Sequence, residues 1–262
     1  MKLNVNSPGY VLTFAAVVST VFTGAIMTLH AVGERAAADA ARLYQQKSLV
    51  EVFDLGKDKP RPLGDEQVRE LYRQSIRPYD KLLRDPRTGI VFNDPDPNAG
   101  PLAPRTFVAL SGGGGGEILG YALPITGIGF WARIDGYLAV TPDLSKVIGI
   151  VFVRHQETPG LGGRITEPRW RGQFRGLDIA QPDDGGKYIY VGGDRPREKD
   201  NPRYGRHVDA ITGATGTSTA VERFVNRDID AFRRATEAAG SLERAKRNNM
   251  ISRRERGERR ED

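Results

Sequence analysis

The chain of 262 residues contains no cysteine. This absence excludes disulfides, a thiolate nucleophile and any metal or iron–sulfur centre that is held by cysteine. Histidine is also scarce, because His30, His155 and His207 are the only three. They lie far apart and show none of the spacings typical of a metal site. We therefore expect no metal site and no cysteine nucleophile.

Positive charge is in only small excess. The formal net charge is +6, and arginines alternate with acidic residues over most of the chain. Proteins that bind nucleic acid usually gather their basic residues into a stripe or a patch. We therefore expect no nucleic-acid partner.

One segment, residues 10–32, contains no Asp, Glu, Lys or Arg. About 20 apolar residues are enough for a helix to cross a bilayer. A cleaved signal peptide is the alternative, since small residues follow in "AAADAA", but its apolar stretch is usually about 7–15 residues long. The length here favours an uncleaved anchor. Lys2 precedes the segment, and Arg35 and Arg42 follow it, so the flanking charges do not decide its orientation.

The remainder of the chain has strand and helix patterns. "KVIGIVFVRH" and "KYIYVGG" read as strands, because they are rich in β-branched and aromatic residues. A helix is expected from about residue 218 to 238, with an apolar stripe along one side. The run "SGGGGGE" lacks the Gly-Lys-Ser/Thr ending of a nucleotide-binding loop, so we interpret it as a flexible insertion.

A turn rich in threonine precedes that helix, in "DAITGATGTSTAVERFVN" from residue 209. Its hydroxyl groups suit helix capping. Gly213 and Ala214 also remove side-chain bulk, so that a phosphate could approach the positive end of the helix. Threonine is a poor nucleophile without a base, and neither histidine nor lysine neighbours Thr215. A phosphate ester at this residue would therefore require another enzyme.

Three stretches resemble one known family. "DAITGAT" resembles the flavinylation motif Asp-x-x-(Ser/Thr)-Gly-Ala-Thr of FMN-binding subunits in the sodium-translocating NADH:quinone oxidoreductase and in the related Rnf complex. "HQETPGLGGRITEPRWRGQF", residues 155–174, is similar to the segment beside the isoalloxazine ring in that family, and its "PRW" is closer to the C-type subunit of the sodium pump. "GIGFWARIDGYLAV" is similar to a third family segment, a strand.

This resemblance implies one covalent FMN, whose phosphate a flavin transferase joins to Thr215. Thr158 would bond the polar edge of the ring and Leu161 would pack on its face, unless this is an ordinary glycine turn with Leu161 in the protein core. The cofactor-binding residues implied are Thr215, Asp209, Thr212, Gly213, Ala214, Thr217, Ser218, Glu157, Thr158, Pro159, Gly160, Leu161, Gly162 and Trp131.

The resemblance also implies an α+β fold. A single transmembrane helix (1–33) and a helical and Pro-rich connecting and packing region (34–105) would precede a mixed-sheet FMN-binding domain with flanking helices (106–240). The charged residues 241–262 would be disordered or a solvated helix. The expected function is that of an electron-transfer subunit, with no active site of its own, in a complex that passes electrons from NADH to ubiquinone and moves sodium. Its domain would lie on the periplasmic side of the bacterial inner membrane, among the other subunits.

Three alternatives remain open from the sequence. The chain could be an Rnf G-type subunit, a separate membrane-anchored FMN carrier, or a tethered binding module in which Thr215 only caps a helix. Gly216 departs from the family, which more often has an apolar residue there, and we expect this glycine to loosen the turn.

Overall fold

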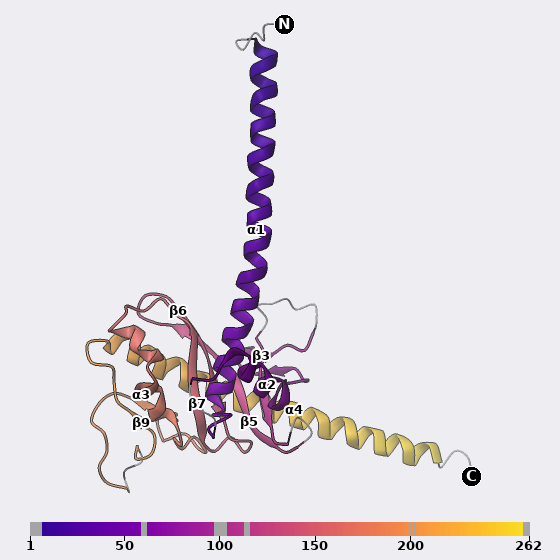
Figure 1. Ribbon diagram of the computed structural model, residues 1–262. Coiled ribbons are helices and arrows are strands. Elements are labelled where there is room, and N and C mark those ends of the chain that lie inside the picture. The colour runs from indigo at the N-terminus through magenta and orange to yellow at the C-terminus, as the bar shows by residue number, and fades with distance from the viewer. Residues whose placement is uncertain are drawn as a thin grey trace. The chain divides into compact units, whose positions relative to one another are not determined.

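The computed structural model describes residues 7–58, 62–96, 104–112, 116–199, 201 and 203–258 (Figure 1). The chain divides into two compact units, Met1–Gln45 and Gln46–Asp262. The described part of the first unit is helical and belongs to helix α1 (Pro8–Val52). Within α1, residues Pro8–His30 are long and apolar enough to cross a membrane, and no other helix in the described residues meets that criterion. The expected apolar segment is therefore a helix.

The second unit is built on an antiparallel sheet of five strands, in the order β1-β4-β5-β6-β7. The strands are β1 (Ile76–Pro78), β4 (Phe107–Leu110), β5 (Ile118–Ile128), β6 (Arg133–Val140) and β7 (Val147–Arg154). Residues 129–132 form the tight turn between β5 and β6, closed by a hydrogen bond from Gly129 N to Ala132 O of 2.8 Å. An antiparallel sheet with helices beside it confirms the expected α+β class.

Short elements complete the second unit. Strands β2 (Leu83–Arg84) and β3 (Val91–Asn93) form an antiparallel pair, and β8 (Tyr190–Val191) and β9 (His207–Val208) form a parallel one. The strand expected in "KYIYVGG" is thus only two residues long. The short helices are α2 (Asp65–Ser75), η1 (Gly162–Thr166), α3 (Pro168–Arg171) and η2 (Gly172–Phe174).

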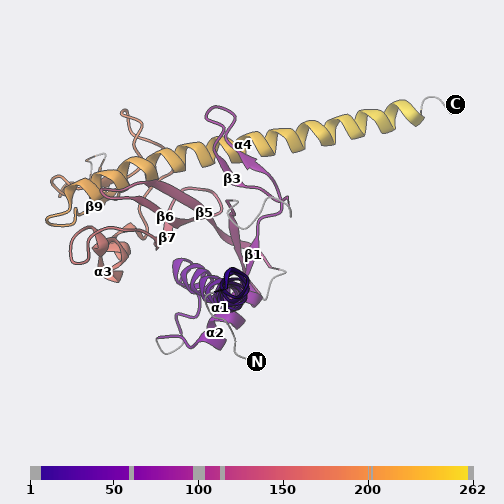
Figure 2. The same ribbon diagram turned by 90° about the horizontal axis from the view of Figure 1, so that it is seen from above.

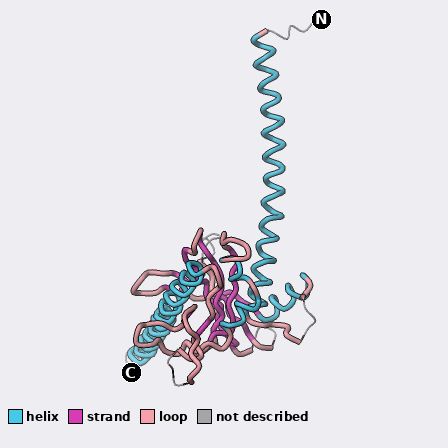
Figure 3. The backbone as a smooth tube through the Cα atoms, turned by 90° about the vertical axis from the view of Figure 1, so that its left-hand side faces the viewer, coloured by secondary structure: helices cyan, strands magenta, loops and turns pink. Residues whose placement is uncertain are grey.

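Helix α4 (Thr215–Glu258) lies along one face of the sheet (Figures 2 and 3). Side chains of a strand alternate between its two faces. On β5, Leu123 and Ile125 therefore join the core that α4 covers, which includes Phe224 and Phe232. Gly127 is on the same face, where an added Cβ would lie 2.3 Å from Phe224 Cδ1. The lack of a side chain at Gly127 allows α4 to approach the sheet closely.

The opposite face of the sheet is covered by the end of α1. Leu49 and Val52 are buried, and an added Cβ on Gly149 of β7 would lie 2.7 Å from Val52 O. A Cβ on Gly120 of β5 would likewise meet Phe53. The sheet is therefore packed between two helical layers, each of which reaches it where a strand carries glycine.

These contacts show how the expected regions of the chain meet the sheet. The connecting and packing region expected at 34–105 contributes β1, which pairs with β4, and the buried last turn of α1. Helix α4 continues to Glu258, so the charged residues 241–258 are helical, which is one of the two forms expected for them. Residues 113–115 of the glycine run lie outside the described residues.

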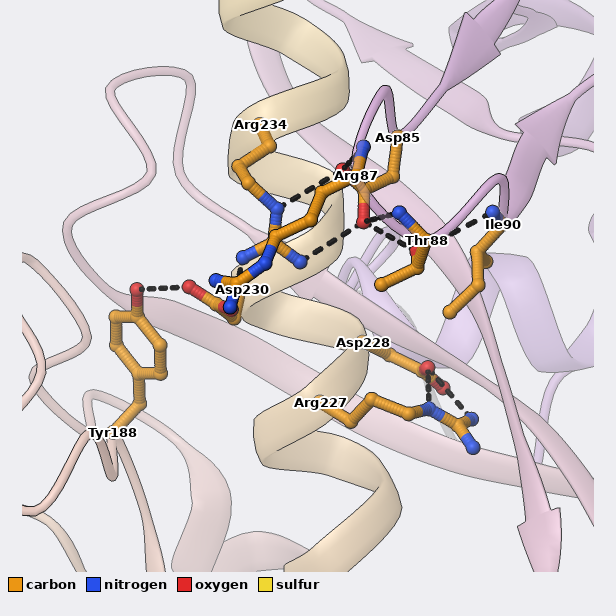
Figure 4. Close-up of polar contacts among 9 residues, drawn as sticks. All are labelled: Asp85, Arg87, Thr88, Ile90, Tyr188, Arg227, Asp228, Asp230 and Arg234. Carbon is orange, nitrogen blue, oxygen red and sulfur yellow. Dashed lines mark hydrogen bonds and ion pairs between the residues drawn. The ribbon is translucent and has the colours of Figure 1, made fainter.

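A polar network fastens the β2–β3 hairpin to α4 (Figure 4). The carboxylate of Asp85 is fully buried and accepts hydrogen bonds of 2.9 Å from both Nε and Nη2 of Arg234. Arg234 also forms an ion pair with Asp230 on its own helix. The Arg234 guanidinium holds the pKa of Asp85 far below its usual range. Two-point pairing of this kind fixes geometry as well as charge.

Asp228 is a second buried carboxyl group on α4. Its Oδ2 accepts a 3.0 Å hydrogen bond from Thr126 N of β5. Nη2 of Arg227 lies 2.7 Å from its Oδ1 (Figure 4). Burial raises the pKa of Asp228 to about 6, against an ordinary value of 3.8. The folded state therefore binds a proton here more tightly than the unfolded chain does.

We predict that Asp228 makes the free energy of unfolding fall as pH rises from about 4 to 7. Its contribution is complete below the unfolded pKa and is lost as pH passes through the folded pKa near 6. The loss should be about 2–3 kcal/mol, at about 1.4 kcal/mol per pKa unit. Asp228→Asn should remove this slope in urea titrations followed by the fluorescence of buried Trp170. An unchanged slope in the variant would show that Asp228 is not its source.

Candidate cofactor site

Segments far apart in the sequence meet at the start of α4. They are the β5–β6 turn (129–132), the loop after β7 (155–163) and the threonine-rich turn (209–218). The sequence singled out all of these stretches, and the structure brings them together. Their junction is formed by one buried carboxylate.

Glu157 is that carboxylate, with 4% of its surface exposed. Its Oε1 accepts hydrogen bonds from the backbone N–H groups of Phe130 (3.0 Å) and Trp131 (3.1 Å). Its Oε2 accepts a short hydrogen bond from the buried hydroxyl of Thr217 in α4. A buried carboxylate is costly unless its oxygens are paired, and here both are. Glu157 therefore joins the three segments.

Two glycines, which carry no side chain, make this junction possible. An added Cβ on Gly162 would lie 2.5 Å from Thr217 Oγ1 and 2.6 Å from Glu157 Oε2. An added Cβ on Gly129 would lie 2.5 Å from Glu157 Oε1. Real Cβ atoms do not approach other atoms so closely, so each position accepts glycine alone without rearrangement.

The threonine-rich turn exposes a helix end. Gly213 has φ +77°, a left-handed conformation that glycine adopts easily. Ser218 fastens the turn to α4, since its Oγ accepts from Ile211 N and donates to Ala214 O, both at 3.0 Å. Ala214 stands directly before the helix and has no side-chain oxygen with which to cap it. The positive end of α4 is therefore available to an anion.

Thr215 is the first residue of α4, and its side chain is exposed. Thr212 and Gly213 beside it are also exposed, whereas Ala214 is buried. An added Cβ on Gly213 would lie 3.1 Å from Leu161 Cδ2, so the second motif contacts the turn directly.

Large apolar side chains surround this helix end. Phe130, Trp131 and Leu161 are 63%, 67% and 44% exposed, and the two aromatic rings meet edge to face with centroids 5.1 Å apart. Trp131 Nε1 donates a 3.0 Å hydrogen bond to Thr158 Oγ1. Leu161 is thus not a core residue, and the ordinary-turn alternative is wrong in this respect. Pro159 and Gly160 are exposed beside it.

Asp209 is the one predicted site residue that points elsewhere. Its carboxylate is 3.2 Å from Arg195 Nε and 3.5 Å from His207 Nε2. Its backbone is fixed by Trp170 Nε1, which donates to Asp209 O at 2.8 Å, and by Gln173. We therefore assign Asp209 to the support of the turn and not to the exposed helix end.

The sequence analysis missed Phe130, although it adjoins Trp131 in "GIGFW". An added Cβ on Gly216 would lie 2.6 Å from Phe130 Cδ2. The ring of Phe130 thus occupies the space that a side chain at position 216 would fill. The expected loosening of the turn at Gly216 stays a prediction. The similarity to the third family segment implied that Trp131 is in a strand. It lies instead in the β5–β6 turn.

Comparison with known proteins finds a domain family over the stretch that contains these segments. Residues 129–230 match the FMN-binding domain family. They include all three segments that meet at Glu157. The resemblance inferred from the motifs is thereby confirmed.

Two of the similar curated proteins are C subunits of the Na(+)-translocating NADH-quinone reductase. The one from Pasteurella multocida is 33% identical over 144 residues, which are 54% of this chain and 53% of the relative. The one from Yersinia pestis is 34% identical over 172 residues, which are 64% and 62% of the two chains. The chain thus spans a little over half of the length of these relatives.

A solved structure has the same fold. It is the C subunit of the Na(+)-translocating NADH-quinone reductase from Parabacteroides distasonis, with a TM-score of 0.57 and 19% identity. The match covers 76% of this chain and 95% of the other. At this identity the likeness shows the fold alone.

We predict that Gly162→Ala lowers the free energy of unfolding by about 1–3 kcal/mol, the usual cost of forcing an extra methyl group into a packed site. The cause is the contact of the new Cβ with Thr217 and Glu157. Gly172→Ala is the matched control, because no atom lies within 4 Å of a Cβ there and its φ is −60°. Urea denaturation of both variants measures the difference. Equal stability of the two would mean that the junction is not tightly packed.

Proposed function

We propose that this chain is an electron-transfer subunit that carries one FMN, joined covalently to Thr215 through its phosphate. The observation that carries the proposal is the meeting of three family motifs around the exposed, uncapped start of α4. A phosphate ester on Thr215 would lie at the positive end of the helix dipole, which favours its charge. A flavin transferase would form the ester.

The ring would lie over the exposed apolar side chains beside Thr215. Leu161, Phe130 and Trp131 offer faces and edges for a flat ring system. Thr158 already receives the indole N–H of Trp131, so its hydroxyl proton is free to face a polar ring edge. FMN would supply the redox chemistry, and this chain would hold it and tune its potential.

We further propose that the chain belongs to a sodium-translocating NADH:quinone oxidoreductase, as its C-type subunit. The named relatives support this assignment over the Rnf G-type subunit. The exposed apolar surface around Thr215 favours a flavin carrier over a binding module in which Thr215 merely caps α4. The complex would bring NAD, ubiquinone and the other subunits as partners.

The proposed location is the bacterial inner membrane, with Pro8–His30 as a single anchor and the second unit on the periplasmic side. The apolar helix supports an anchor by its length and composition. A covalent bond would keep the cofactor from being lost outside the cytoplasm.

We predict that Thr215→Ala abolishes covalent flavin when the chain is produced together with a flavin transferase. In-gel fluorescence after denaturation and intact mass measure the attachment. The fold should be retained, because the Thr215 side chain is exposed and alanine favours helices.

Thr219→Ala is the matched control, since Thr219 is another exposed threonine of α4, one turn further along. It should keep full flavin attachment. Flavin that stays bound to Thr215→Ala in denaturant would contradict the assignment of the attachment residue.

We predict that alkaline phosphatase fused after Gly240 is active, because that enzyme requires the oxidising periplasm for its disulfides. β-Galactosidase fused at the same residue should be inactive. The reverse pattern would place the second unit in the cytoplasm.

A further inference from the structure

A second candidate site lies beside the motif "DAITGAT" and away from the first residue of α4. It is a cavity of about 380 Å³ between η2 and the segment that precedes β9. Arg175, Arg195, Arg203 and His207 line it. A cavity of this volume is in the range of small-molecule sites and far exceeds the space of one water molecule.

The arginines leave an excess of positive charge in this cavity. Arg175 pairs with Asp54 at 2.8 Å and Arg195 pairs with Asp209 at 3.2 Å. Among the described residues no carboxylate forms an ion pair with Arg203. Its guanidinium instead lies over the Tyr190 ring, with Cζ 4.5 Å from the centroid. Stacking fixes the plane of the guanidinium while its N–H groups remain able to bind an anion.

His207 is a buried residue that also lines the cavity. It is 6% exposed, and its Nε2 has no hydrogen-bond partner among the described residues. The nearest carboxylate oxygen, Asp209 Oδ1, is 3.5 Å away. Burial lowers the pKa of His207, and Arg195 and Arg203 lower it further, against the opposing effect of Asp209. A buried polar atom without a partner is uncommon in folded proteins.

We propose that this cavity binds a small organic anion through its phosphate or carboxylate group, held by Arg203 and Arg195. Leu177, Pro196 and Tyr204 line the same cavity and give it an apolar wall, so the ligand should carry an apolar or ring portion besides its charge. A planar guanidinium binds either anionic group with two parallel hydrogen bonds. The proposal does not rest on FMN attachment, because Thr215 takes no part in it.

An anion bound in the cavity would affect the motif "DAITGAT" through its first residue, Asp209. Arg195 is shared, since its Nε contacts Asp209 and its Nη2 donates to Gln173 Oε1 at 2.8 Å. A bound anion competes with Asp209 for Arg195. It therefore changes the ion pair at the first residue of "DAITGAT".

The test uses the full chain in detergent with phenyl phosphate as the probe. Isothermal titration calorimetry gives the affinity, and ¹⁵N-histidine NMR follows His207, one of only three histidines. We expect phenyl phosphate to bind more tightly than inorganic phosphate and to raise the pKa of His207. Arg203→Gln should weaken binding roughly tenfold, as expected for one charge-assisted hydrogen-bonded contact.

Arg169→Gln is the charge-matched control, because Arg169 is exposed on α3 and does not line the cavity. It should bind the probe as the unmodified chain does, and the flavin content of all variants should be unchanged. Equal weakening in both arginine variants, or no response of His207, would overturn the proposal. So would a His207 response to vesicles that contain phosphatidylglycerol but not to phenyl phosphate, since the anion would then be a lipid headgroup.

Discussion

The packing of α4 on the five-stranded sheet is the contact on which the other features depend. Phe224 lies against Gly127, and the apolar side of the helix continues through Ile229 and Phe232 into the hydrophobic core. The same helix carries Thr215 at its first residue and Arg234 further along. The packing of α4 on the sheet therefore sets the position of the exposed helix end and of the β2–β3 hairpin that Arg234 binds.

Glu157 ties the other segments of the candidate site to the start of α4. Its two oxygens link the start of α4 to the β5–β6 turn, and glycines on both sides leave it enough room. A paired carboxylate in a buried position defines one geometry, because breaking either bond would leave charge without a partner. The backbones of Phe130 and Trp131, which present exposed rings beside Thr215, are thus held in place.

Two places on this domain are positively charged, each for a different physical reason. The start of α4 is positive through its backbone dipole and bears no acidic residue in its first turn. The cavity near β9 is positive through guanidinium groups, and Asp209 lies between the two. A negatively charged group has a physical reason to bind at either place, and Asp209 is the residue through which one could affect the other.

The sequence by itself determined the apolar helix, the apolar stripe of α4 and the identity of the glycine-rich segments. All of these are local signals, set by hydropathy over one stretch, by a period of about 3.6 residues or by residues of unusual conformational freedom. Most of the candidate site could be named in this way. Its family resemblance was also readable, because the motifs are short and continuous.

Only the tertiary structure decided how these pieces combine. Glu157 and Thr217 are 60 residues apart in the chain, and Asp85 and Arg234 are 149 apart, so no local pattern indicates either pair. The pairing of β1 with β4, the place of Phe130 over Gly216 and the turning of Asp209 toward Arg195 are of the same kind. Each results from the way in which α4 and the end of α1 pack on the two faces of the sheet. That packing is decided by many contacts between distant parts of the chain, so no single segment predicts it.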